Sequence, residues 1–231
     1  MLSESDADPM ALLRTIVLPS RPATLNLEDF THLDQSMRAI LPFLGHALAT
    51  GRRGTTLLLY GPPGTGKSEL SRLLARETQA ELFEVTSENE HGNPMDGERR
   101  LRAFRVAQCF LGQRRSLLLF DEVEDVFPDS SPWGGASASE NKAWINRMLE
   151  DNPVPTVWVT NAVHSLDPAF VRRLDLVVAC HIPPRERPEQ ILRPACRNVH
   201  LVAEPMPPPP PFFYLDPVVL HRSLAFPHAL R

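Results

Sequence analysis

The chain has 231 residues, enough for one large domain or a domain with an appendage, and its 42% hydrophobic and 23% charged residues are ordinary for a globular protein. A formal net charge of −4 does not favour non-specific binding of nucleic acid or a membrane surface, and no apolar run approaches the roughly 18 residues of a membrane span. Three widely spaced cysteines argue against a disulfide framework or a metal site, and the polar start is unlike a secretion signal, so a cytoplasmic location is expected.

Residues 1–24 are predicted to be an irregular segment, because prolines interrupt any long helix there. Apolar residues then recur at helical spacing from Leu33 to Gly51, which predicts a helix with a bend or restart at Pro42. A short apolar run over residues 57–60 stops at Gly61, as expected for a strand that ends in a turn.

The strand is followed by GPPGTGKS, which matches the phosphate-binding loop G-x-x-x-x-G-K-[ST] at every fixed position. In such a loop glycines let backbone N–H groups close around a phosphate, and the next helix presents its positive end to the same anion. Lys67 is expected to reach the β- and γ-phosphates, and the Ser68 hydroxyl to hold Mg²⁺. The residues predicted to bind the nucleotide are Gly61, Pro62, Pro63, Gly64, Thr65, Gly66, Lys67, Ser68 and Glu69.

Helical and strand patterns alternate after the loop, which predicts parallel β-α-β units. Helices are expected over residues 69–75, 99–111, 142–149 and 168–173, and strands over 57–60, 81–86, 116–121, 156–159 and 174–182. Residues 128–139, rich in Pro, Ser and Gly, are predicted to be a loop. The fold class is therefore α/β: a P-loop NTPase whose five-stranded parallel sheet has helices on both faces.

Two adjacent acids, Asp121 and Glu122, follow the continuous apolar run that ends at Phe120. A buried strand of this kind delivers them to its carboxyl end, where ligands bind in open α/β sheets. We expect Asp121 to contact Mg²⁺ and Glu122 to act as general base on the attacking water.

Two further polar groups follow later elements. Asn161 ends the strand over 156–159, where its amide is expected to orient the water or contact the γ-phosphate; an isolated asparagine at a strand end is more often a turn residue.

Arg172 and Arg173 are adjacent on a short helix, and arginine suits stabilisation of phosphate charge because its planar donors bind oxygens bidentately. Such an arginine finger can come from a second protein molecule. An ordinary surface arginine pair is the alternative.

GPPGTGKS, LLLFDE, VTN and LDPAFVRRLD, in this order and spacing, resemble the ATPase module of the AAA family within the AAA+ superfamily. The resemblance covers about residues 27–190. It implies that Gly61–Ser68 bind ATP, that Asp121 and Glu122 serve Mg²⁺ and water activation, and that Asn161 is the sensor. No N-K-x-D guanine motif follows the fourth strand, so ATP is favoured over GTP.

The same resemblance assigns Arg172 and Arg173 to the family's finger positions, which act on ATP in the neighbouring subunit of a ring, usually a hexamer. The segment Leu27–Phe30 is similar to the family's segment beside the adenine. By resemblance, then, the chain is a homo-oligomeric ATP hydrolase, with Lys67, Glu122 and Asn161 as its other catalytic residues and a protein partner as the substrate it remodels.

Two departures from the family pattern stand out. Remodelling members carry an aromatic–apolar–glycine pore loop, but residues 93–97 contain only Met95 as a large apolar side chain. A helix like the first one of the family's helical lid begins at residues 185–193, and half of the 24 prolines lie in residues 183–231. The sequence thus predicts an ATPase core over 25–193 and an irregular Pro-rich tail, 194–231, in place of the lid, through truncation or a shifted reading frame.

Three functions fit these signals to different degrees. The leading one is ATP hydrolysis coupled to remodelling of a protein partner. The alternative is a nucleotide-binding module with little or no turnover, because closure completes such sites and the lid is predicted to be missing. A DNA-replication subunit is disfavoured, since the composition carries no basic surface signal.

Overall fold

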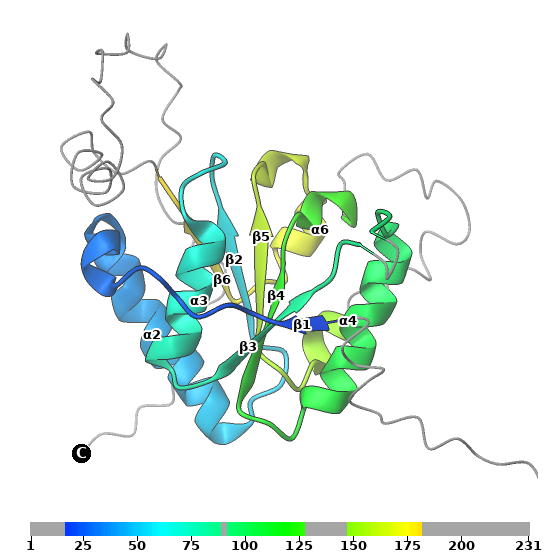
Figure 1. The fold of residues 1–231 in the computed structure, drawn as a ribbon, viewed down its shortest axis with the longest axis horizontal. Helices are drawn as coiled ribbons and strands as arrows, with labels where there is room; N and C mark the ends of the chain where they lie inside the picture. Colours follow the sequence, from blue (N-terminus) through cyan, green and yellow to red (C-terminus); the bar gives the residue numbers. More distant parts are fainter. Residues whose placement is uncertain (1–16, 89–91, 128–146, 182–231) are drawn as a thin grey trace, which may run out of the picture.

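The computed structural model describes residues 17–88, 92–127 and 147–181 (Figure 1). They form a six-stranded sheet of order β1-β3-β4-β5-β2-β6. The strands are β1 (Val17–Pro19), β2 (Thr56–Tyr60), β3 (Glu81–Val85), β4 (Ser116–Phe120), β5 (Thr156–Thr160) and β6 (Leu176–Ala179). The helices are η1 (Leu27–Leu33), α2 (Asp34–Thr50), α3 (Lys67–Glu77), α4 (Gly97–Leu111), η2 (Val123–Asp125), η3 (Val163–Ser165) and α6 (Pro168–Val171). Residues 147–151 are also helical.

The five strands β2 to β6 pair in parallel throughout, which confirms the predicted parallel sheet. The chain crosses from β2, deep in the sheet, to β3 near one edge, and then returns through β4 and β5 to the side of β2. This order brings the carboxyl ends of β4, β5 and β2 next to one another. Asp121 follows β4, Asn161 follows β5, and the phosphate loop follows β2.

Strand β1 adds a sixth member that the sequence did not predict. It pairs antiparallel with β3, with Val17 opposite Val85, and the backbone N–H of Ser20 donates to the Leu82 carbonyl at 2.8 Å. The three residues of β1 are too few to show a recognisable alternation of apolar and polar side chains. Pro19 also favoured a prediction of irregular structure. Proline is tolerated here because β1 lies at the edge of the sheet, where its missing N–H removes no ladder bond.

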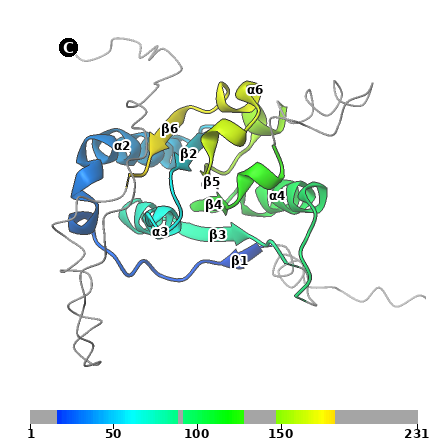
Figure 2. The same ribbon diagram turned by 90° about the horizontal axis from the view of Figure 1, so that it is seen from above.

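Helices cover both faces of the sheet, α2 and α3 on one side and α4 and α6 on the other (Figure 2). Successive strand residues point to opposite faces, so each strand contributes to two hydrophobic cores. Leu57 and Leu59 of β2 pack with α2 and α3, whereas Leu58 between them packs on the side of α4. β4 and β5 are buried along their whole length, as predicted for strands covered on both faces.

The sequence predicted a bend or a restart at Pro42, and the restart is absent, because α2 runs without interruption from Asp34 to Thr50. Pro42 is exposed, and so is Arg38, the residue whose carbonyl loses its helical N–H partner there. The helix ends where Gly51 adopts the left-handed conformation (φ 64°) and donates its N–H to Ala47. Within the described ranges, no helix combines the length and the apolar character needed to cross a membrane.

Candidate functional site

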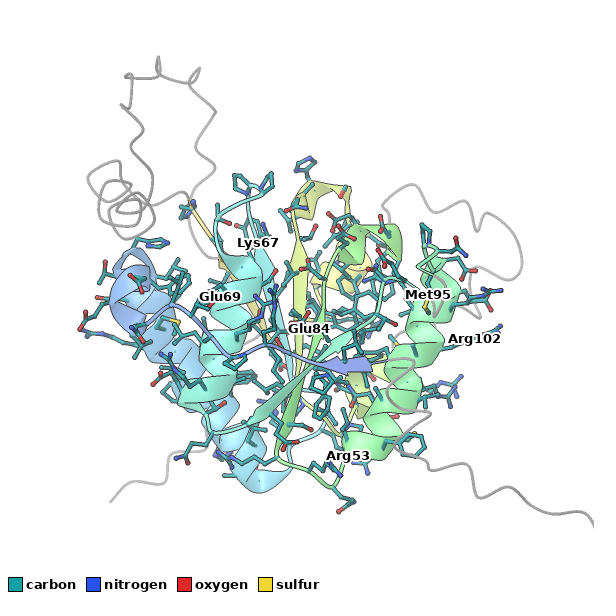
Figure 3. All side chains as sticks on the ribbon, viewed as in Figure 1. Arg53, Lys67, Glu69, Glu84, Met95 and Arg102 are labelled. Atoms are coloured by element: carbon teal, nitrogen blue, oxygen red, sulfur yellow. The ribbon has the colours of Figure 1, made fainter. Side chains whose placement is uncertain are left out.

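The candidate site lies at the carboxyl edge of the sheet. The loop that begins at Gly61 follows β2, Asp121 follows β4, and Asn161 follows β5, and these three strands are neighbours in the sheet. Figure 3 shows Lys67 at the upper end of α3, where the loop joins the helix. Segments up to 100 residues apart in the chain therefore meet at one place.

Two glycines give the phosphate loop its course. Gly61 has φ 149°, and a Cβ placed on it would lie 2.2 Å from the backbone oxygen of Cys180. Gly66 has φ 83° and precedes the first residue of α3, so the helix starts from a left-handed residue. Both positions exclude an ordinary side chain, the first by contact and the second by backbone conformation. Thr65 braces the loop by donating its hydroxyl to the Pro62 carbonyl at 3.0 Å.

The Lys67 ammonium group lies inside this loop and has three oxygen partners. Nζ donates to the carbonyls of Gly61 and Pro62 at 2.8 and 2.9 Å and to Oδ1 of Asn161 at 2.9 Å. Burial lowers the pKa of Lys67, and nearby acidic groups, among them Asp121, offset part of that effect. The loop lysine and the predicted sensor are thus in direct contact.

The two predicted magnesium ligands also meet. The Ser68 hydroxyl donates to Oδ2 of Asp121 at 2.8 Å, although 53 residues separate them. A hydroxyl and a carboxylate oxygen are both hard ligands of the kind that Mg²⁺ prefers. No group of three or more His, Cys, Asp or Glu side chains suited to a metal lies in the described part of the chain. Mg²⁺ beside a phosphate needs only one or two protein ligands, because phosphates and water complete its shell.

Glu122 has a backbone conformation that residues with side chains seldom adopt. Its φ of 54° and ψ of 51° are left-handed, and its side chain is exposed. Its N–H donates to Oδ1 of Asp121 at 2.9 Å, which ties the turn to the preceding carboxylate. A left-handed residue that is not glycine stores strain, and such residues cluster at functional sites. The turn directs the Asp121 and Glu122 carboxylates differently, one to Ser68 and the other to solvent.

Glu124 belongs to the site as well, although the sequence reasoning missed it. Its Oε1 accepts the backbone N–H of Asn161 at 3.3 Å, so the end of β4 is joined to the end of β5. Its charge also acts on Lys67. The sequence shows a third acid two residues after Glu122. It does not show that this carboxylate accepts the N–H of Asn161, a contact that the fold creates.

The two predicted finger residues, Arg172 and Arg173, make a hydrogen bond and an ion pair with groups outside the phosphate loop. Arg172 is exposed, and its Nε donates to the Pro168 carbonyl of its own helix at 3.1 Å. Arg173 forms an ion pair with Glu150 at 2.7 Å. Neither of these contacts joins a guanidinium to the described phosphate loop or acidic turn. Of the two, Arg172 is the one whose side chain is not held by a carboxylate among the described residues.

Glu69, predicted to bind nucleotide, has its carboxylate directed elsewhere. It accepts the N–H and hydroxyl of Thr24, the N–H of Leu25 at 3.1 Å and the guanidinium of Arg72 at 3.1 Å. Burial raises the pKa of Glu69, but these hydrogen bonds outweigh it and lower the pKa to about 2. The side chain therefore anchors the segment before η1 to α3.

Phe30 lies against the same loop from the N-terminal side. It is 3% exposed, and its ring comes within 3.4 Å of where a Cβ on Gly66 would be. The segment Leu27–Phe30, likened in the sequence to the family's segment beside the adenine, thus packs beside the phosphate loop.

Met95, the large apolar side chain in the region where the family carries its pore loop, is half-buried. It packs against the core on the α4 side, and its sulfur accepts a hydrogen bond from Thr86 at 3.7 Å. Figure 3 shows it beside the upper end of α4. The predicted loop over 128–139, the start of a lid helix over 185–193 and the tail over 194–231 lie outside the described residues.

Comparison with known proteins agrees with this geometry. The model of the family described as "ATPase family associated with various cellular activities (AAA)" matches residues 57–182, more than half of the chain. The mouse protein "ATPase family gene 2 protein homolog B" is 33% identical over 185 residues, which cover 74% of this chain and 25% of that protein. The chain therefore spans about a quarter of the length of this curated relative.

Solved structures share the fold. The FIGL-1 AAA domain superposes with a TM-score of 0.57 at 23% identity, covering 85% of this chain and 68% of that one. A chain of the Escherichia coli MS115-1 HORMA:CdnC:Trip13 complex gives a TM-score of 0.52 at 18% identity, covering 86% and 74%. With the phosphate loop, the acidic turn and the asparagine at one sheet edge, and the family match over the same residues, this chain belongs to the AAA family of ATPases.

Proposed function

We propose that the chain binds ATP with Mg²⁺ and hydrolyses it. The observation that carries this proposal is the convergence of Lys67, the Ser68–Asp121 pair, Glu122 and Asn161 at one sheet edge. An isolated phosphate loop needs only backbone N–H groups and a lysine to bind a triphosphate. Binding alone does not require Glu122 or Asn161, whereas each of them matches a need of the hydrolytic step.

Each side chain has a defined task in this proposal. Ser68 and Asp121 hold Mg²⁺, which neutralises negative charge on the phosphates. Lys67 exchanges its carbonyl partners for phosphate oxygens. Glu122, whose carboxylate is exposed, takes a proton from the attacking water. Asn161 orients that water through the amide that now contacts Lys67.

We further propose that Arg172 acts on ATP in a neighbouring copy, within a ring that is hexameric by family resemblance. Its exposure, and a hydrogen bond that joins its guanidinium to Pro168 rather than to the chain's own loop, support supply in trans, and its neighbour Arg173 is held by Glu150. A protein is the proposed substrate of this ring. One structural neighbour is a chain of a HORMA:CdnC:Trip13 complex, and this assembly of different proteins supports a protein partner here.

Steady-state phosphate release tests the proposal against simple nucleotide binding. Wild type should release phosphate faster than Glu122→Gln and Lys67→Ala, and the rate per subunit should rise with protein concentration. Glu122→Gln should still bind ATP, whereas Lys67→Ala should bind it weakly. If wild type releases no more phosphate than Glu122→Gln at any concentration while both bind ATP, the chain is a binding module without turnover.

A further inference from the structure

Arg100 is a buried cation directly beneath the acidic turn. It lies on α4 with its side chain only 3% exposed, whereas the side chains of Arg99 and Arg102 on the same helix are 66% and 71% exposed. Figure 3 shows Arg102 on the outer side of α4, away from the sheet. A charged side chain is seldom buried unless its partners compensate for the loss of water. We therefore expect specific partners to compensate for the burial of the Arg100 charge.

The partners of Arg100 are the backbone of the acidic turn and the end of β4. Its guanidinium donates to the carbonyl of Asp121 and, at 3.4 Å, to the carbonyl of Glu122. The same group stacks over the Phe120 ring, 4.5 Å from its centroid, and lies 3.8 Å from the Asp125 carboxylate. One planar side chain thus binds residues before, within and after the turn.

These contacts hold a conformation that the turn would not favour by itself. Glu122 has a left-handed backbone although it is not glycine, and this conformation is strained. A strained backbone conformation persists only where contacts with the surrounding structure hold it in place. α4 approaches the turn closely, since a Cβ on Gly97 would lie 3.0 Å from the Asp125 carbonyl. Arg100 therefore reaches the turn from a rigid element rather than from a flexible loop.

Arg100 is not simply filling space. Its buried Nε has no hydrogen-bond partner among the described residues, and burial lowers its pKa despite the nearby acids, with Asp125 the strongest of them. An apolar side chain would fill the same volume without that desolvation. Only a planar donor pair can hold two successive carbonyls and stack on an aromatic ring at once.

We propose that Arg100 is a positioning residue for the hydrolytic reaction: it fixes the left-handed turn that aims the Glu122 carboxylate at the attacking water. This inference rests on the proposed ATP hydrolysis, because it assigns Glu122 a direction that matters only for chemistry. It does not concern nucleotide affinity, which depends on the phosphate loop.

The test compares Arg100→Lys and Arg100→Met with a matched control, Arg102→Lys. Arg102 lies on the same helix, but its guanidinium pairs with Glu98 in solvent. The Arg100 variants should lower kcat at least about tenfold, because small displacements of a catalytic group have large effects. The KM for ATP and the affinity for a fluorescent ATP analogue should stay within about twofold, and Arg102→Lys should behave as wild type. An equal loss of nucleotide affinity in the Arg100 variants would overturn the proposal.

A double-mutant comparison separates positioning from general damage. In a Glu122→Gln background, Arg100→Lys should lower the residual rate no further, because the side chain that it positions is already inactive. If the tenfold effect persists in that background, Arg100 acts through something other than Glu122 and the proposal fails.

Amide hydrogen exchange gives a readout that does not need turnover. Peptides covering residues 121–127 should exchange faster in Arg100→Lys than in Arg102→Lys, while peptides from α3 should stay unchanged. Unchanged exchange over 121–127 would contradict the proposal even in an inactive protein. Absence of ATP hydrolysis in wild type, with the exchange difference present, would instead count against the proposed function alone.

Discussion

Gly61 has no room for a side chain, whereas Gly45 has ample room for one. At Gly61 a Cβ would lie 2.2 Å from the Cys180 carbonyl, whereas at Gly45, inside α2, it would meet nothing within 4 Å. Gly61→Ala should therefore lower the free energy of unfolding by more than about 2 kcal/mol, because backbone must move on one side of the loop. Gly45→Ala should raise it by about 0.5–1 kcal/mol, since alanine favours the helix.

Urea unfolding at equilibrium measures both changes, and a fluorescent ATP analogue reports on the loop. Gly61→Ala should also weaken nucleotide binding, while Gly45→Ala should not affect it. A Gly61→Ala protein as stable as wild type would mean that the Cys180 carbonyl shifts without cost, contrary to the close packing of β2 and β6.

The carboxylate of Glu69 should make stability depend on pH in the acid range. Its pKa is about 2 in the folded chain, against an ordinary 4.5, so the folded state favours the ionised form. The stabilisation is complete above pH 4.5 and is lost as the pH falls from there towards 2. Glu69→Gln should cost about 2 kcal/mol at neutral pH and progressively less as the medium becomes acidic.

Thermal unfolding from neutral pH to about pH 3 measures this, with Glu98→Gln as the control. Glu98 pairs with Arg102 in solvent, so its loss should change stability by less than about 1 kcal/mol at neutral pH. If the melting temperatures of wild type and Glu69→Gln stay equally far apart throughout the acid range, the carboxylate does not stabilise the fold through its charge.

Site residues were predictable where their chemistry is local, and not where a distant partner defines them. Lys67, Ser68 and Asp121 were picked from adjacent sequence, and the fold brings Ser68 to Asp121 and Lys67 to Asn161. Glu124 and Arg100 were missed, because each acts through backbone groups that other segments supply. A backbone N–H or carbonyl has the same identity at every residue, so the sequence carries no mark of such a contact.

Helix α4 offers a comparison of buried and exposed phenylalanine on one element. Phe104 is fully buried against Phe120 and Trp158, whereas Phe110 is 41% exposed. Phe104→Ala should lower the free energy of unfolding by about 3–5 kcal/mol through lost contacts and a residual cavity. Phe110→Ala should cost less than about 1 kcal/mol.

Urea titrations with equal slopes for both variants would make the two values comparable. Since α4 also carries Arg100, Phe104→Ala should reduce ATP hydrolysis as well as stability, while Phe110→Ala should change neither. Equal losses in the two variants would indicate that α4 packs differently from the arrangement described.

The parallel strands could be predicted from the sequence, whereas β1 could not, because only some elements carry their own apolar pattern. β2, β4 and β5 have a clear apolar signal, because both of their faces are covered. β1 has only three residues and exists through its pairing with β3. Of the bend or restart expected at Pro42, the restart did not occur: the helix is continuous, and Ile40 and Leu44 on either side of Pro42 are buried in the core.

The proposed ring makes a prediction about mixtures of inactive proteins. Lys67→Ala subunits cannot bind ATP well but retain Arg172, and Arg172→Ala subunits retain the phosphate loop but lack the finger. Each alone should release little phosphate. Mixed, the two should regain part of the wild-type rate, because an intact loop in one subunit meets an intact arginine from the next.

A mixture of Lys67→Ala with Glu122→Gln is the control, because both lesions lie in the loop's own subunit. That mixture should stay inactive. Equal activity in both mixtures would mean that the arginine is not supplied across an interface, and full activity of Arg172→Ala alone would remove it from the reaction.

The sequence by itself determined the α/β class, the phosphate loop and the acidic strand end, because periodicity and short motifs are local properties of the chain. Tertiary structure alone decided that Lys67 contacts Asn161, that Glu69 holds Thr24, and that Arg100 lies under Glu122. These contacts depend on the order in which the strands pair and on which helix covers each face. That order follows from packing of the whole chain, so no local pattern contains it.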